Sequence, residues 1–315
     1  MQEIVEFVKI FACLAALVFV LVQVQQSAAK KGTWLPSTDN AAKREYEVWA
    51  LRYSVVWMGI FGVVVVTKAY KSFDADGYMY LCCGLALPLL LQPLFFPLPA
   101  EKNLPLFLRY SFKANVWIAG FSFIGNYWYT HYFYSVLKAT YTMPSHRLNN
   151  VPIALYFATH FYFTSYHTFS NLILRKVETS FAPTLLRSLL FWAVVVTFSY
   201  FTAFMESFTI SSYEYYSFSV PKALIYSLGS FFYGIYFLVS FPVFYRLDEK
   251  VSLKEMVAPH TLFQTVFEVL GSGMLVLLLL DFCRIGLGVP LNIPGSFFCV
   301  SEEGKQCVFK NGSGR

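Results

Sequence analysis

Residues 113–152 read KANVWIAGFSFIGNYWYTHYFYSVLKATYTMPSHRLNNVP and combine a long apolar segment with embedded polar side chains. A membrane-spanning helix needs about 20 mostly apolar residues, and the first part of this stretch supplies them. The same part carries Asn115, Asn126 and His131 among several tyrosines. Hydrocarbon tolerates such groups only where they face protein, water or a bound ligand. The stretch therefore predicts a transmembrane helix whose polar side chains are candidates for function.

The composition of the chain is typical of a membrane protein. Of its 315 residues, 57% are hydrophobic and only 13% are charged, whereas about a quarter are charged in soluble domains. We expect an all-α polytopic membrane protein, built as a single bundle of about eight transmembrane helices. The predicted spans are residues 4–22, 48–67, 78–99, 114–136, 151–173, 184–206, 223–245 and 262–283.

The distribution of charge predicts the orientation of the chain. Glu3 and Glu6 outnumber Lys9 at the start of the first span, and several Lys and Arg residues follow that span. This balance favours an uncleaved anchor with a linker at residues 1–30 over a signal peptide, with both termini luminal and the odd-numbered loops cytosolic. The net charge of +6 indicates neither a nucleic acid nor an acidic substrate.

The rest of the chain divides into a transmembrane domain, residues 31–290, and a polar C-terminal tail, residues 291–315. The tail contains Cys299, Cys307 and the N-glycosylation acceptor Asn311-Gly312-Ser313. Both features suit an oxidising lumen, although two cysteines and one acceptor sequence also arise by chance.

The histidines exclude one class of membrane enzyme. Membrane di-iron hydroxylases and desaturases need many histidines at spacings such as HxxxH and HxxHH, because each iron takes several imidazoles. Neither spacing occurs among the five histidines of this chain, and there is no glycine-rich phosphate loop or nucleophile elbow. We therefore expect no metal ion and no cofactor.

Polar side chains share one face of the predicted span 151–173. His160, Thr164, His167 and Asn171 follow one another at offsets of four, three and four residues, which places them on one side of a helix. They are candidates for contact with a substrate. The alternative is that the two histidines only form hydrogen bonds between helices.

The predicted span 114–136 contributes a second group of candidates. Asn126 shares a helical face with Thr130, and Tyr127 shares one with His131. His131 lies in the half of the membrane next to the even-numbered loops, and His160 lies near the midplane, so both are candidate bases.

Acidic residues complete the set. Glu206 lies at the end of a predicted span and has no basic residue near it in sequence, while Glu268 lies early in the last span. Asp281 precedes Arg284 by three residues, so an interfacial ion pair is expected. The charged residues of the loop 244–250, FYRLDEK, are expected to form a solvated network.

Several segments resemble the cycloeucalenol cycloisomerases, in the same order along the chain. Besides residues 113–152, they are TWLPSTDNAAKREYEVWALRYSVVW (33–57), FTSYHTFSNLILRKV (163–177), SYFTAFMESFTISSYEYY (199–216), YGIYFLVSFPVFYRLDEK (233–250) and LLLLDFCRIGLG (277–288). The resemblance spans roughly residues 33–290, which marks 31–290 as an isomerase domain. The first 30 residues and the tail have no counterpart in it.

The resemblance implies a redox-neutral reaction on a tetracyclic sterol in the endoplasmic reticulum membrane. A proton enters the 9β,19-cyclopropane ring of a cycloeucalenol-type sterol, and a ring-junction proton leaves to give a Δ8 sterol such as obtusifoliol. Neither metal nor nicotinamide is required. The implied partners are the cyclopropyl sterol and membrane lipid, with no nucleic acid.

Depth and chemistry, rather than the resemblance, suggest which residues act. A carboxylic acid kept neutral by an apolar site is a suitable donor, so Glu206 is the expected acid and His131 or His160 the base. The expected substrate contacts are Asn126, Tyr127, Thr164, His167 and Asn171. Two alternatives are a non-catalytic sterol-binding or transport protein, which needs no acid and base, and a subunit of a membrane complex.

Overall fold

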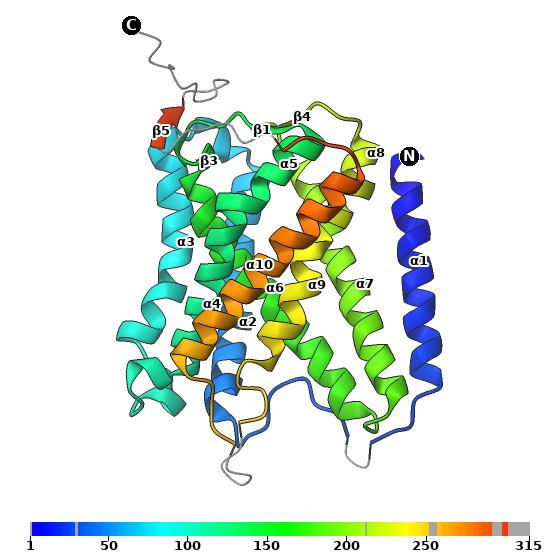
Figure 1. Cartoon of the computed structure of the whole chain (residues 1–315). Coiled ribbons are helices and arrows are strands. Elements are labelled where there is room, and N and C mark those ends of the chain that lie inside the picture. The colour runs from blue at the N-terminus through cyan, green and yellow to red at the C-terminus, as the bar shows by residue number, and fades with distance from the viewer. Residues whose placement is uncertain (1, 29–30, 212, 252–256, 292–297, 302–315) are drawn as a thin grey trace, which may run out of the picture.

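The computed structural model describes residues 2–28, 31–211, 213–251, 257–291 and 298–301. Most of this part is helical, and the helices run side by side (Figure 1). The long helices are α1 (Gln2–Gln23), α2 (Ala41–Val66), α3 (Ala75–Phe95), α4 (Tyr110–Ile124), α6 (Ile153–Ser180), α7 (Leu185–Ile210), α9 (Ser230–Arg246) and α10 (Leu262–Gly286). Two short ones are α5 (Thr130–Leu137) and α8 (Lys222–Leu224). The predicted all-α polytopic class is confirmed.

Each predicted span coincides with a helical segment, but not every segment qualifies as a span. Five helices of the described part are long and apolar enough to cross a membrane, namely α2, α3, α7, α10 and the continuous helix Lys222–Arg246. In α1 the apolar portion is the shorter Phe7–Gln23. The interior of α6 contains buried polar side chains, which lower its hydropathy. The number eight is therefore not established.

The segments that connect the helices lie at two opposite ends of the bundle. The start of α1, α5 and the strands lie at one end, which we call the strand face (Figure 1). The connections between α1 and α2, α6 and α7, and α9 and α10 lie at the other end, the loop face. The start of α1 and residues 298–301 thus share a side, as the predicted topology requires. Which side is luminal remains a prediction.

Two helical rods contain a π-turn toward the strand face. The segment η4 (Gly125–Tyr129) joins α4 to α5, and η5 (Ile225–Gly229) joins α8 to α9. A π-turn inserts a residue into the helix and often occurs at a functional site. A Cβ atom at Gly229 would lie 2.9 Å from Cδ1 of Leu137. A larger residue there would require the Leu137 side chain to move where η5 and α5 approach each other.

Short antiparallel strands, which the sequence did not predict, close the strand face. β1 (Ala139–Tyr141) pairs with β4 (Tyr216–Phe218), and β2 (Ser145–Leu148) pairs with β3 (Val151–Pro152) and β5 (Phe298–Ser301). Asn149 and Asn150 connect β2 to β3 with φ angles of 51° and 60°, as a tight two-residue turn requires. The β1–β4 pair brings Tyr141 beside Tyr216.

Candidate active site

Glu206 lies one turn before the end of α7 and is held by hydroxyl groups. The Oη atom of Tyr233, on α9, donates a 2.6 Å hydrogen bond to Oε1 of Glu206. Tyr166 of α6 also interacts with this carboxyl group. The other oxygen, Oε2, is buried and forms no hydrogen bond with any described residue. The carboxyl group is thus oriented by side chains of α9 and α6 and retains an oxygen for another partner.

Aromatic rings surround this carboxyl group. Five tyrosines lie close enough to Glu206 to interact with it electrostatically, and we call them the tyrosine cluster: Tyr141, Tyr162, Tyr166, Tyr233 and Tyr236. They come from β1, α6 and α9, so the fold gathers them from distant parts of the sequence. The π-face of an aromatic ring attracts a cation within about 6 Å. The cluster can therefore stabilise a carbocation next to the acid.

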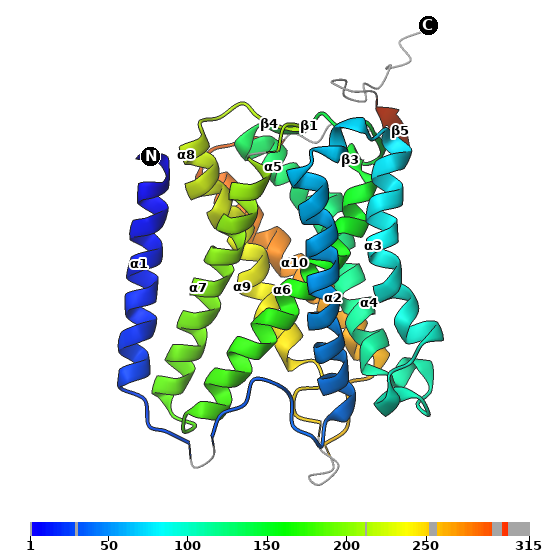
Figure 2. The same cartoon turned by 180° about the vertical axis from the view of Figure 1, so that it is seen from behind.

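A groove leads from the lipid-facing surface to Glu206. It lies between α6 and α7 and encloses about 450 Å³, within the range of roughly 300–1,000 Å³ typical of small-molecule sites. The two helices converge at the loop face and diverge toward the strand face, with α9 visible between them (Figure 2). We call this cavity the α6–α7 groove.

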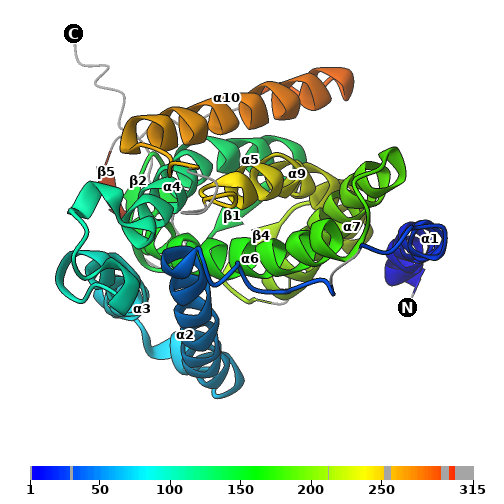
Figure 3. The same ribbon diagram turned by 90° about the horizontal axis from the view of Figure 1, so that it is seen from below.

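The lining of the α6–α7 groove is almost entirely apolar. Phe169 and Ile173 line it from α6, and Phe198, Phe201 and Met205 line it from α7. The side chains of Phe201 and Met205 are 36% and 42% exposed, so the groove is open along its side. Seen from below, α1 packs on the side of α7 that faces away from α6 (Figure 3). A flat apolar molecule can enter from the bilayer.

His131 lies outside the α6–α7 groove but near the tyrosine cluster. Its side chain is fully buried, and neither ring nitrogen has a close hydrogen-bond partner among the described residues. The imidazole packs edge-on against Tyr134 with 5.5 Å between ring centroids, and Tyr134 packs against Tyr141 at 5.8 Å. An aromatic path therefore connects His131 with the surroundings of Glu206.

His160 and its neighbours on α6 are buried, as the common helical face predicts. The Nε2 atom of His160 lies 2.9 Å from Oδ1 of Asn115 on α4. The hydroxyl of Thr164 donates to the His160 carbonyl over 2.8 Å. His160 does not line the α6–α7 groove. The α6–α7 groove therefore contains the expected acid, Glu206, but neither of the expected bases.

His167 and Asn171 have partners on other helices. His167 Nδ1 lies 2.7 Å from the carbonyl oxygen of Phe163 and therefore donates, while Nε2 lies 2.9 Å from the hydroxyl of Ser240 on α9. Asn171 donates to Glu47 of α2 over 2.9 Å. These contacts support the alternative of hydrogen bonds between helices.

The two candidate substrate contacts in η4, Asn126 and Tyr127, have different neighbours. Asn126 donates to the hydroxyl of Thr159 over 2.7 Å and thereby joins η4 to α6. Tyr127 is partly exposed and stacks on Phe123 with ring centroids 5.6 Å apart. Neither residue lines the α6–α7 groove.

Comparison with known proteins adds an independent observation. Over 278 residues the chain is 38% identical to the cycloeucalenol cycloisomerase of Arabidopsis thaliana, and the alignment covers 87% of this chain and 94% of that protein. This chain belongs to the cycloeucalenol cycloisomerase family. It is therefore an isomerase. No family model and no solved structure matches the chain.

This family member also contains a charged core that the sequence analysis missed. At the loop face, Arg175 forms ion pairs with Glu47 at 2.8 Å and with Glu249 at 2.6 Å, and Lys43 lies 2.8 Å from Glu249. A neighbouring group joins Lys113, Asp248 and His260. We call these seven residues the loop-face ionic cluster. Lys43 and Glu47 lie four residues apart just before the predicted span 48–67, and this spacing was the available signal.

The cluster corrects one expectation and leaves another confirmed. Asp248 is only 5% exposed, and its carboxylate pairs with Lys113 and His260 rather than with its sequence neighbours. The expected solvated network in residues 244–250 is therefore wrong, because the loop folds back beneath α2 and α4. The expected pair of Asp281 and Arg284 is present, at 2.7 Å.

Proposed function

We propose that the protein opens the 9β,19-cyclopropane ring of cycloeucalenol-type sterols and yields a Δ8 sterol such as obtusifoliol. The relative's name supplies the substrate and the class of reaction. The observation that carries the proposal is the position of Glu206 at the end of an apolar groove, bonded to Tyr233 and next to the tyrosine cluster. The endoplasmic reticulum membrane is the proposed location.

The proposed reaction transfers one proton in and one proton out. The carboxylic acid of Glu206 donates a proton to the cyclopropane methylene, the bond from that methylene to the ring junction breaks, and the positive charge remains on the ring carbon. Tyrosine π-faces stabilise this cation. Loss of the adjacent ring-junction proton then forms the Δ8 double bond. General acid catalysis of this kind contributes roughly 10²–10⁴-fold.

The base receives a proton that the cation renders strongly acidic, so a neutral imidazole is sufficient. We propose His131 for this role because Tyr134 connects it to the tyrosine cluster, with His160 as the second candidate. The other expected substrate contacts, Asn126, Tyr127, Thr164, His167 and Asn171, lie outside the α6–α7 groove, and we propose that they act on the reaction only by holding the helices around it.

Sterol profiling of a cell that lacks this isomerase tests the proposal. Expression of the protein is expected to lower the cyclopropyl sterol and raise its Δ8 product, and purified protein is expected to do the same without added cofactor. Binding of cycloeucalenol without turnover would instead favour the sterol-binding protein considered above. Restored assembly of a membrane complex, without any change in the sterols, would favour a role as a subunit.

A further inference from the structure

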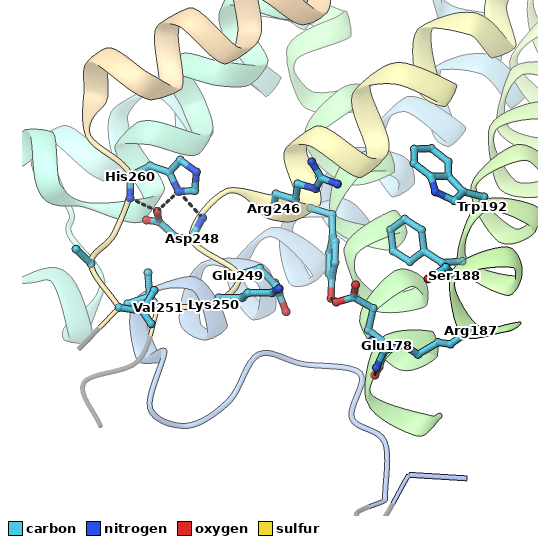
Figure 4. Close-up of a pocket in the computed structure, with 14 residues that line it drawn as sticks. Glu178, Arg187, Ser188, Trp192, Arg246, Asp248, Glu249, Lys250, Val251 and His260 are labelled. Atoms are coloured by element: carbon cyan, nitrogen blue, oxygen red, sulfur yellow. Dashed lines mark hydrogen bonds and ion pairs between the residues drawn. The ribbon is translucent and has the colours of Figure 1, made fainter. Parts of the chain in front are cut away.

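A second cavity lies at the loop face, far from Glu206. It encloses about 450 Å³ between the start of α7, the end of α9 and the segment that follows (Figure 4). Ser188 lines this cavity and Glu206 lines the α6–α7 groove. With a rise of 1.5 Å per residue, eighteen residues of α7 separate them by about 27 Å. The cavity therefore has no part in the proposed reaction.

Two of the three carboxylates that line this cavity are already compensated by buried cations. Asp248 and Glu249 belong to the loop-face ionic cluster, and the buried cations of that cluster hold the pKa of both carboxyl groups below the usual range, despite burial that opposes ionisation. Glu178 accepts a 2.9 Å hydrogen bond from the hydroxyl of Tyr245. Glu178 alone keeps an uncompensated negative charge at the cavity wall, and the basic residues Arg187, Arg246 and Lys250 outnumber it.

Two basic side chains of the cavity, Arg246 and Lys250, remain available, and a third, Arg187, is bound to backbone. Arg246 and Lys250 are exposed and form no side-chain hydrogen bond or ion pair with any described residue. The guanidinium of Arg187 is held by the carbonyl oxygens of Glu178 and Phe181, at 3.0 and 3.3 Å. A guanidinium fork matches the oxygens of a phosphate group. The cavity thus presents a positive charge that nothing in the described protein uses.

One wall of the cavity continues into a lipid-facing surface. Phe191 and Trp192 line it from the first turns of α7, with ring centroids 5.8 Å apart. On the same turns Leu185, Leu189 and Trp192 are 76%, 49% and 49% exposed. Tryptophan is enriched where a helix leaves the hydrocarbon. A ligand with an anionic head and apolar tails satisfies both parts of the cavity.

We propose that this cavity binds the phosphate-bearing headgroup of an anionic phospholipid, with the phosphate near Arg246 and Lys250 and the acyl chains along α7. Each basic residue near an anionic lipid surface contributes about 1 kcal/mol, so removing one is expected to weaken binding about fivefold. Removal of both Arg246 and Lys250 is expected to weaken it about 25-fold.

The test uses the full chain in nanodiscs of phosphatidylcholine, with and without phosphatidic acid. Lipid retained by the protein is counted by native mass spectrometry, and the unfolding temperature is measured in parallel. The double variant R246A/K250A is compared with Lys102→Ala, an exposed basic residue elsewhere on the loop face. Because Arg187 also caps carbonyls of α6, Arg187→Gln is a secondary variant only.

We expect phosphatidic acid to be retained and to raise the unfolding temperature of the wild type and Lys102→Ala, but not of the double variant. Retention by the double variant at the wild-type level would overturn the proposal, as would an equal loss in Lys102→Ala. Inorganic phosphate alone should leave the unfolding temperature unchanged. Stabilisation by inorganic phosphate equal to that by the lipid would show a site for soluble anions instead.

Discussion

The hydroxyl of Tyr233 lies 2.6 Å from Oε1 of Glu206 and links α9 to α7 inside the bundle. The groups that act on this carboxyl are the Tyr233 and Tyr166 hydroxyls and its own burial, with no basic side chain among the described residues. An acid in such surroundings can hold a proton until a substrate takes it. The contact therefore relates the fold directly to the proposed chemistry.

Replacing Glu206 by glutamine is expected to abolish most turnover. The amide keeps the size of the side chain but cannot deliver a proton to carbon, so the rate should fall at least about 100-fold, while folding and sterol binding persist. His131→Ala and His160→Ala should each reduce turnover less, because water partly replaces a weak base. Turnover by purified protein at matched expression is the measurement.

The control for this substitution is Glu214→Gln, which removes an exposed carboxylate paired with Lys71 at the strand face. It should leave turnover unchanged. A Glu206→Gln protein that unfolds at a lower temperature but retains normal specific activity would contradict the catalytic role of Glu206 and indicate a structural one.

Removing the hydroxyl of Tyr233 should slow the reaction without preventing it. Hydrogen bonds to charged groups contribute about 1.5–3 kcal/mol, so Tyr233→Phe is expected to lower turnover by roughly 10- to 100-fold. Tyr236→Phe is the matched control, because the Tyr236 hydroxyl is buried without a hydrogen-bond partner among the described residues. Equal effects of the two substitutions would show that the hydrogen bond to Glu206 does not matter.

The ion pairs of Arg175 predict a large loss of stability on truncation. Arg175→Ala leaves the buried carboxylate of Glu47 without its cation, and breaking a buried pair in this way typically destabilises by about 3–5 kcal/mol. Arg246→Ala removes an exposed arginine at the same face and should change stability little. Unfolding in detergent measures both. Similar unfolding of the two variants would disprove the structural importance of the pair.

His260 predicts a dependence of stability on alkaline pH. Hydrogen bonds to Asp248 and Glu268 raise the pKa of His260 from 6.5 to about 9. A raised pKa in the folded state stabilises the protein fully below about 6.5, and this contribution disappears as the pH rises through about 9. Unfolding temperatures of the wild type and His260→Gln should therefore differ at pH 6 to 7 and converge near pH 10. A difference in unfolding temperature that stays the same from pH 6 to pH 10 would contradict the raised pKa of His260.

The predicted orientation can be tested with single cysteines in a variant that lacks the native ones. Ala258→Cys lies at the loop face and Ser217→Cys at the strand face, and both positions are exposed. We expect an impermeant reagent to label position 258 from the cytosolic side, and position 217 only after the lumen is opened. A cysteine in the loop that contains Lys102 should also be labelled from the cytosolic side. The reverse pattern would invert the topology.

The sequence predicted the elements that depend on local patterns. Apolar runs place the helical segments, and the offsets of His160 and His167 place both inside the bundle, because helical periodicity alone decides these features. The strands at β1 and β4 were missed, since three-residue segments paired over a long separation leave no periodic signal. The π-turns were missed because the one residue that each inserts does not change the apolar character of the segment, which therefore reads as an ordinary helix.

The site was predictable only in part. Glu206 was chosen because it lacks a basic neighbour, and the structure shows a buried carboxyl oxygen at that position. Its partners Tyr166 and Tyr233 resembled ordinary interfacial tyrosines in sequence, since only tertiary packing brings α6 and α9 to the end of α7. The tail with Cys307 and the acceptor Asn311-Gly312-Ser313 lies outside the described residues, and of Cys299 only the backbone in β5 is described.

The open side of the α6–α7 groove also determines how the proposed reaction should be quantified. A sterol that reaches Glu206 along Phe201 and Met205 never passes through water, so its bulk molarity does not enter the rate law. The relevant variable is the mole fraction of sterol in the surrounding bilayer. Diluting the membrane with inert lipid then slows turnover as effectively as removing substrate, and a Michaelis constant has meaning only as a surface concentration.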